Sequence, residues 1–192
     1  MKPSKKIAIT GGIGSGKSVL CAILREMGYP VFSCDEIYAR LCGEADYIAL
    51  IEKRFPACVK DGSIDKKALS RLVFADETAR NELNGLSHPR IMARLLEQMA
   101  GHQVAFAEVP LLYEGGFEGL FDGVIAVIRD KSARVSAVSA RSGLSEGEIL
   151  ARMAAQLDEG VYRERGAYLI VNDGSLDDLR QSAQKLIEHF GI

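Results

Sequence analysis

A glycine-rich turn near the start of the chain constrains the fold more than any other segment. An apolar run leads into Gly-Gly-Ile-Gly-Ser-Gly-Lys-Ser at residues 11–18. Four residues separate Gly11 from Gly16, and Lys17 and Ser18 follow, which is the spacing of a phosphate-binding P-loop. Glycines let backbone N–H groups approach phosphate oxygens, because no Cβ stands in the way. The segment therefore predicts a strand, a nucleotide-phosphate site and a helix that begins near Lys17.

The last two residues of this motif carry its charge and its metal chemistry. Lys17 is placed to contact the β- and γ-phosphates, and the Ser18 hydroxyl is placed for Mg²⁺. A dinucleotide-binding fingerprint is excluded, because Lys17 stands where its third glycine would have to be. The loop residues that we expect to bind ATP are Gly12, Ile13, Gly14, Ser15, Gly16, Lys17, Ser18 and Val19.

The composition fits one α/β domain with a small inserted subdomain, because the chain has 192 residues and 47% of them are hydrophobic. A net charge of −2 gives no basic excess for nucleic acid. Four cysteines without a C-x-x-C pair indicate neither a zinc site nor a redox pair. With no transmembrane-length stretch or signal peptide, we expect a cytoplasmic protein that binds no membrane, as a monomer or weak homo-oligomer.

Apolar runs and helical periodicity predict a P-loop kinase fold. It has a five-stranded parallel sheet with helices on both faces, a helical substrate-binding insert after the second strand and a helical lid after the fourth. The predicted strands are residues 7–10, 30–33, 103–109, 123–128 and 168–171. The predicted parts of this single domain are a core (1–36, 101–130 and 158–192), an insert (37–100) and a lid (131–157).

The insert is predicted to be helical, because a block of this length is too large for a simple crossover. Asp65 and Asp76 fit the N-caps of two of its helices. His88 and Pro89 are predicted at the start of the last one, with Pro near the first helical position. From the residues alone, His88 is either a substrate group or a capping or packing residue. Turns are predicted near residues 43–44, 56–63 and 85–89.

Carboxylates follow two of the predicted strands, at the sheet edge where ligands bind in open α/β sheets. Asp35 could accept a proton from a substrate hydroxyl, or it could cap a helix that starts at Glu36. Glu108 lies where an acid often helps to hold Mg²⁺ through water. The loop of residues 110–114 comes next, and its two leucines and tyrosine either line a substrate groove or belong to the core.

Two helices of the predicted lid each present arginine to one side. Arg134 and Arg141 are seven residues apart, and Arg152 and Gln156 are four apart, so each pair shares a helix face. Such arginines suit a lid that clamps phosphates. The alternative is a charged face that only meets solvent.

Taken together, these segments resemble the dephospho-CoA kinase family over essentially the whole chain. The P-loop is common to many families, but an Asp after the second strand together with His-Pro and Pro-Leu-Leu-aromatic-Glu is far more specific. The matching segments are residues 10–18, 34–37, 39–40, 61–65, 73–74, 88–89, 110–114 and 152–156.

The resemblance implies that the chain phosphorylates the ribose 3′-hydroxyl of dephospho-CoA with ATP and Mg²⁺. It implies that Asp35 is the catalytic base and that the insert binds the CoA portion. His88 and the loop Pro110-Leu111-Leu112-Tyr113-Glu114 would belong to the acceptor side. Arg141 would lie in the lid over the phosphates, and Asn172 by the adenine.

The chain departs from the family pattern at three places, which concern the lid and the adenine pocket. Ala137 stands where a second lid arginine is usual, and Arg134 is a candidate to replace it. Ala167 and Val171 stand where the family often has aspartate. Without the resemblance, another small-molecule P-loop kinase or a nucleotide-binding switch would also fit, and an acceptor base such as Asp35 argues against the switch.

Overall fold

The computed structural model describes residues 4–192, in which five strands form one sheet with the order β2-β5-β1-β6-β7. β1 pairs in parallel with β5 and β6, and β6 pairs in parallel with β7. Ile9 lies opposite Glu108, so the P-loop leaves β1 where β5 ends. The predicted parallel sheet is confirmed. The strands are β1 (Lys5–Thr10), β2 (Val31–Ser33), β5 (Val104–Glu108), β6 (Gly123–Ile128) and β7 (Tyr168–Val171).

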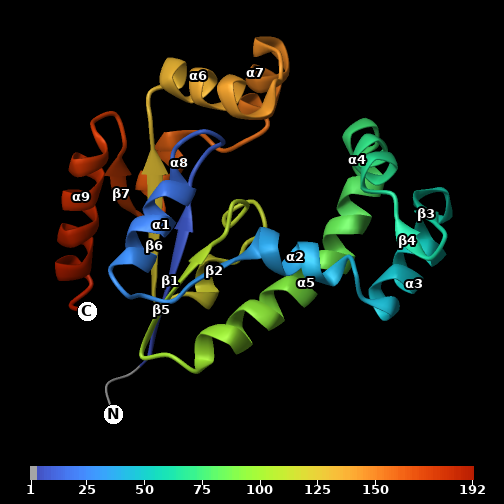
Figure 1. Ribbon diagram of the computed structural model, residues 1–192, viewed down its shortest axis with the longest axis horizontal. Helices are drawn as coiled ribbons and strands as arrows, with labels where there is room; N and C mark the ends of the chain where they lie inside the picture. The colour runs from blue at the N-terminus through green and yellow to red at the C-terminus, as the bar shows by residue number, and fades with distance from the viewer. Residues whose placement is uncertain (1–3) are drawn as a thin grey trace. The chain divides into compact units, whose positions relative to one another are not determined.

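Helices α1 (Lys17–Glu26) and α9 (Leu176–His189) pack against one another beside the sheet (Figure 1). They bury apolar side chains against the strands, and each fully buried side chain contributes about 1.5–3 kcal/mol. This core carries the strand that leads into the P-loop. Its members include Ile7, Ile9, Leu20, Ile23, Leu24, Phe106, Ile125, Val127, Ile170, Leu179 and Leu186.

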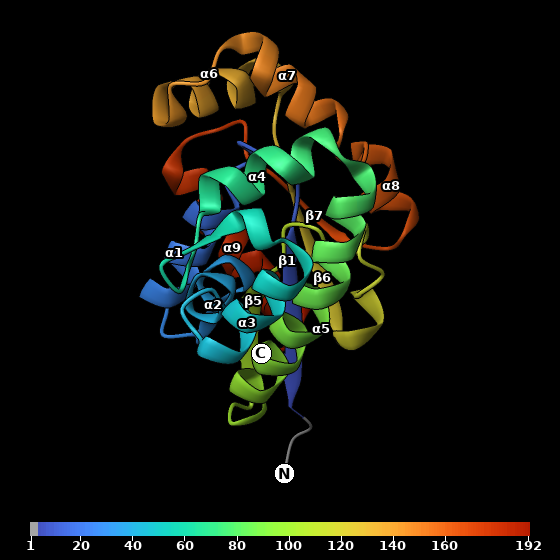
Figure 2. The ribbon, with the colours of Figure 1, turned by 90° about the vertical axis from the view of Figure 1, so that its right-hand side faces the viewer.

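Three further helices follow β6, namely α6 (Lys131–Ser142), α7 (Glu146–Ala154) and α8 (Glu159–Glu164). α6 and α7 lie together beyond the end of β6 (Figures 1 and 2). The sequence predicted this pair but not α8, a short helix whose N-cap Asp158 accepts the Gly160 N–H at 2.9 Å. Along residues 4–192, no helix has both the length and the apolar surface that crossing a membrane requires.

The chain divides into two compact units, one formed by Ser33–Gln98 and the other by the residues on either side. Inside the Ser33–Gln98 unit, the Tyr47 hydroxyl lies 2.7 Å from Ser87 Oγ, and Arg94 forms an ion pair with Glu44. Its elements are α2 (Cys34–Leu41), α3 (Ala45–Arg54), η1 (Pro56–Cys58), β3 (Val59–Lys60), β4 (Ser63–Ile64), α4 (Lys66–Ala75) and most of α5 (Glu77–Ala100). Another short helix, η2 (Glu118–Leu120), belongs to the other unit, which carries the P-loop.

The predicted turn at residues 85–89 is wrong, because α5 continues through it and Pro89 is inside the helix. A proline in a helix interior costs about 3 kcal/mol or more. Burial of one apolar stripe offsets this cost, because the stripe continues on both sides of the exposed Pro89. The buried residues recur every four positions and are Leu83, Ser87, Ile91, Leu95 and Met99. The N-caps predicted at Asp65 and Asp76 are confirmed.

Candidate active site

The P-loop has a backbone shape that requires glycine. Gly11, Gly14 and Gly16 have φ angles of 137°, 77° and 99°, a region that residues with a side chain rarely adopt. Gly16 is also the N-cap of α1, and no side chain caps the helix there. The first N–H groups of α1 are therefore placed to bind an anion, with the positive end of the helix dipole behind them.

Close neighbours provide a second reason for glycine in this loop. A Cβ on Gly12 would stand 2.2 Å from a guanidinium nitrogen of Arg134. One on Gly14 would stand 2.7 Å from the Arg134 carbonyl oxygen, and one on Gly16 would stand 2.1 Å from Asn172 Nδ2. The loop is therefore enclosed by α6 on one side and by the segment after β7 on another.

Three side chains from distant segments bind the main chain of the loop. Asn172 Nδ2 donates to the Ser15 carbonyl at 2.8 Å. Arg134 Nε donates to the Ile13 carbonyl at 2.9 Å, and the Ile13 N–H donates to Gln156 Oε1 at 2.7 Å. The sequence indicated Arg134, Gln156 and Asn172 as lid or nucleotide residues, but it gave no sign that they hold the loop itself.

Lys17 brings its positive charge to the loop that precedes it. Its ammonium group donates to the Gly11 carbonyl at 2.8 Å and to the Gly12 carbonyl at 3.0 Å. One turn later, burial and then the negative charge of Glu108 raise the pKa of the Cys21 thiol to about 12. Cys21 therefore stays neutral, within hydrogen-bonding reach of the Glu108 carboxylate.

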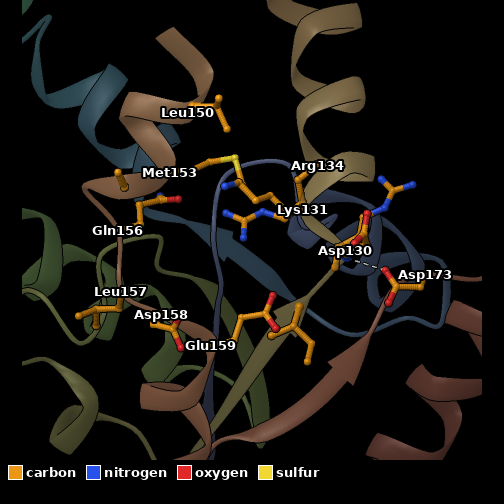
Figure 3. A pocket seen from close by; sticks show the side chains of 13 residues that line it. Asp130, Lys131, Arg134, Leu150, Met153, Gln156, Leu157, Asp158, Glu159 and Asp173 are labelled. Atoms are coloured by element: carbon orange, nitrogen blue, oxygen red, sulfur yellow. Dashed lines mark hydrogen bonds between the residues drawn. The ribbon is translucent and has the colours of Figure 1, made fainter. Parts of the chain in front are cut away.

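A cavity of about 900 Å³ lies between α6, the end of α7 and the start of α8, and two of the side chains that bind the loop, Arg134 and Gln156, line it (Figure 3). Asp173 Oδ1 accepts the Asp130 N–H at 2.7 Å, which ties the start of α6 to the turn after β7. The size is that of small-molecule sites in proteins. The lining residues are Ile128, Arg129, Asp130, Lys131, Arg134, Leu150, Met153, Ala154, Gln156, Leu157, Asp158, Glu159 and Asp173.

The loop after β5 buries most of its apolar side chains. Leu112 and Tyr113 belong to the core, whereas Leu111 is 41% exposed. The Tyr113 ring lies 5.8 Å from the ring of Tyr162, and the Arg165 guanidinium lies 5.3 Å from its centroid. The loop was predicted either to line a substrate groove or to belong to the core, and Leu112 and Tyr113 belong to the core. An acceptor-side role for the loop of residues 110–114 stays a prediction.

In the Ser33–Gln98 unit, Asp35 does not cap its helix. α2 begins at Cys34, and Ser33 is its N-cap, with Oγ accepting the Glu36 N–H at 3.4 Å. Asp35 is exposed in the first turn of this helix. The capping alternative is therefore wrong for Asp35. His88 is half-buried in α5, and burial lowers the pKa of its imidazole, which favours the neutral form.

The two lid arginines that share a face of α6 have different surroundings. Arg134 is partly buried on the loop, whereas Arg141 is exposed in the last turn of the helix. Arg152, on α7, is exposed as well. The phosphate-clamping role of Arg141 stays a prediction.

The residues present fit a magnesium ion that arrives with a nucleotide. The Ser18 hydroxyl and the Glu108 carboxylate would offer oxygen atoms, which Mg²⁺ prefers, and Mg²⁺ usually keeps several waters and binds substrate phosphates as well. Within residues 4–192, no group of three His, Cys, Asp or Glu side chains could hold a metal ion by itself.

Comparison with known families decides which P-loop protein this is. The family model described as dephospho-CoA kinase matches residues 5–178. The chain belongs to the dephospho-CoA kinase family. A curated dephospho-CoA kinase of Thermus thermophilus is 39% identical over 183 residues, covering 94% of this chain and 89% of the relative. That of Anaeromyxobacter dehalogenans is 38% identical over 190 residues, with 94% and 90% covered.

Solved structures support membership of the dephospho-CoA kinase family. The crystal structure of TT1252 from Thermus thermophilus has a TM-score of 0.88 and 38% identity, and the alignment covers 98% of each chain. The dephospho-CoA kinase from Campylobacter jejuni has a TM-score of 0.71 and 28% identity, with 96% of each chain covered. A shikimate kinase from Bacteroides thetaiotaomicron, at 18% identity and a TM-score of 0.54, shares the fold. The predicted family and fold are confirmed, and the chain is a phosphotransferase of an ATP-using kinase family.

Proposed function

We propose that the chain transfers the γ-phosphoryl group of ATP to the ribose 3′-hydroxyl of dephospho-CoA. The products are coenzyme A and ADP, and the reaction is the last step of coenzyme A synthesis. The observation that carries this proposal is the family match over residues 5–178. The P-loop supports it, because its glycines, its lysine and the uncapped start of α1 are the parts that a nucleotide triphosphate requires.

On the donor side, the proposal gives each group one electrostatic task. Lys17 and the N-terminus of α1 offset negative charge on the phosphates, and Arg141 adds charge from the lid. Ser18, with Glu108 through water, would hold Mg²⁺, which when bound neutralises charge on the β- and γ-phosphates. Asn172 would lie by the adenine, next to the loop carbonyl that it binds.

On the acceptor side, Asp35 orients the 3′-hydroxyl and takes its proton. The oxygen attacks the γ-phosphorus in line, and ADP leaves with the electrons of the broken bond. Two facts support this role: Asp35 comes two residues after the end of β2, and it is exposed without serving as a cap. His88 and the loop of residues 110–114 contribute to the acceptor site, and the insert of residues 37–100 binds the CoA portion.

We further propose that the protein works in the cytoplasm as a monomer or weak homo-oligomer. The support for the compartment is cysteine chemistry. Each of the four cysteines is buried within the described residues and none forms a disulfide, as in proteins of reducing compartments. Size-exclusion chromatography with light scattering over a range of concentrations tests the oligomeric state.

An acceptor screen tests the reaction. ADP release is measured with ATP and Mg²⁺ in the presence of dephospho-CoA, shikimate, adenosine or no acceptor, and the product is analysed by mass spectrometry. We expect release with dephospho-CoA alone, a product heavier by one phosphate at the 3′-position, and loss of the reaction when EDTA removes Mg²⁺. Release that is equally fast without any acceptor would instead indicate a hydrolysing switch.

A further inference from the structure

One residue of the P-loop, Ile13, has both polar atoms of its main chain bound by side chains from far along the sequence. Its N–H donates to Gln156 Oε1 at 2.7 Å, and its carbonyl accepts from Arg134 Nε at 2.9 Å. Gln156 follows α7 and Arg134 lies on α6, and the two approach the same cavity from different elements (Figure 3). Neither contact belongs to the P-loop motif itself.

Packing at the neighbouring glycines holds the same part of the loop. A Cβ on Gly14 would stand 2.7 Å from the Arg134 carbonyl oxygen and 2.8 Å from Val138 Cγ2, so the loop lies directly against α6. The first part of the loop is therefore fixed by van der Waals contact and by hydrogen bonds on either side of one residue. A site preorganised in this way loses less freedom when a ligand binds.

The position of Ile13 in the loop indicates whether Gln156 supports ATP binding or competes with ATP. Ile13 is one of the loop residues expected to bind ATP, but Gln156 occupies only its N–H, and Ile13 precedes Lys17 and the N–H groups at the start of α1 by four residues. A side chain bound at Ile13 therefore leaves the helix N-terminus to the phosphates. This favours a supporting role over one in which Gln156 competes with ATP.

We propose that Gln156 is a positioning residue for ATP: its carboxamide holds the Ile13 N–H while Arg134 holds the Ile13 carbonyl, so that the loop has its phosphate-binding shape before the nucleotide arrives. The inference rests on the proposed function in one respect only, namely that the loop binds ATP. It assigns the Gln156–Ile13 contact a role in nucleotide affinity rather than in the chemical step.

Gln156→Met tests this role, because methionine keeps the length of the side chain but supplies no amide oxygen. We expect the Kd for ATP, measured by calorimetry without acceptor, to rise roughly tenfold, as for a partly buried donor that loses its partner. KM for ATP should rise with it, while kcat, the Tm and the Kd for dephospho-CoA stay at wild-type values. Gln181→Met, the same change at an exposed position of α9, should leave all of these values unchanged.

Hydrogen exchange at the Ile13 amide distinguishes positioning of the loop from a purely structural role of Gln156. The Ile13 amide should exchange faster in Gln156→Met, and protection should return in Gln156→Glu, whose carboxylate also accepts an N–H. A wild-type Kd for ATP in Gln156→Met overturns the proposal, and tighter binding would mean that Gln156 competes with phosphate. If the wild-type protein binds ATP but does not phosphorylate dephospho-CoA, the proposed function fails and this inference stands; if it does not bind ATP, both fail.

Discussion

Polar side chains from distant segments hold a loop in one compact unit of the chain, whereas the contacts described in the other join helices to one another. In the unit that carries the P-loop, Arg134, Gln156 and Asn172 bind the main chain of one loop. In the Ser33–Gln98 unit, side chains from different elements bind one another, as in the contact of Tyr47 with Ser87. The first arrangement fixes the shape of a loop, whereas the second fixes how helices pack.

The proposed function gives each unit its own tasks. The P-loop unit presents backbone N–H groups and cations, which suit ATP. The Ser33–Gln98 unit presents an exposed carboxylate, Asp35, and a half-buried neutral imidazole, His88, which suit a hydroxyl acceptor. Substitutions in the first unit should therefore change constants for ATP, and those in the second should spare ATP binding.

The largest effect that we expect is that of Asp35→Asn, which keeps the size of the side chain but cannot take the proton. A general base contributes roughly 10²–10⁴ in rate, so kcat for dephospho-CoA should fall within this range. ATP affinity by calorimetry and the Tm should not change, because Ser33 caps α2. Glu36→Gln, in the same exposed turn, is the matched control. A near-normal rate in Asp35→Asn would contradict a catalytic role for Asp35 and so for the Ser33–Gln98 unit.

Lys17→Ala should have the next largest effect, and it tests whether the unit that carries the P-loop binds ATP. The substitution removes one preorganised charge from the transferring phosphate, so kcat should fall about 10²–10³-fold, with folding intact by circular dichroism. Lys185→Ala on the exposed side of α9 provides the control. Full activity in folded Lys17→Ala would end the assignment of this loop to ATP.

A smaller effect is expected for the exposed lid arginine. A hydrogen bond to a charged group contributes about 1.5–3 kcal/mol, so Arg141→Ala should lower kcat/KM for ATP at least roughly tenfold. Arg163→Ala, an exposed arginine on α8, should change it little. Equal and small losses in both variants would show that Arg141 only meets solvent.

The smallest expected effect is on the pH dependence of stability, and it involves His88 in the Ser33–Gln98 unit. Because burial lowers the pKa of His88 below 6.5, the unfolded chain takes up a proton below this pH that the folded chain does not. The stability linked to His88 is thus fully present above pH 6.5 and decreases as the pH falls through it, by at most about 1.4 kcal/mol per pH unit. The free energy of unfolding, measured with urea between pH 7.5 and 5, should depend less steeply on pH in His88→Gln than in His102→Gln. Parallel curves for the two variants would contradict the link between His88 and stability.

Sequence patterns predicted the P-loop unit more closely than the Ser33–Gln98 unit. β6 and β7 occupy the predicted residues 123–128 and 168–171, because solid apolar runs mark buried parallel strands. In the other unit, Pro89 predicted a helix start, but burial of a long apolar stripe decided the outcome. The six-residue α8 was missed, since so short a charged helix has little periodicity to detect.

The same limit applies to the candidate site. A motif of adjacent residues, such as Lys17 and Ser18, can be found in the sequence because its spacing is local. The contact between Ile13 and Gln156 joins residues 143 positions apart and arises only when α7 ends beside the loop. In the sequence, Gln156 stood out only through its spacing from Arg152 and through the family-like segment 152–156. The helix face predicted to be shared by Arg152 and Gln156 is wrong, because α7 ends at Ala154.

The close approach of Arg134 to Gly12 makes these two positions an epistatic pair. A methyl group at residue 12 would stand 2.2 Å from a guanidinium nitrogen of Arg134. The guanidinium would have to shift, which would disturb the hydrogen bond of its Nε to the Ile13 carbonyl. Alanine at residue 12 and a shorter side chain at residue 134 would thus disturb the same hydrogen bond, so the two substitutions together should cost little more than either alone.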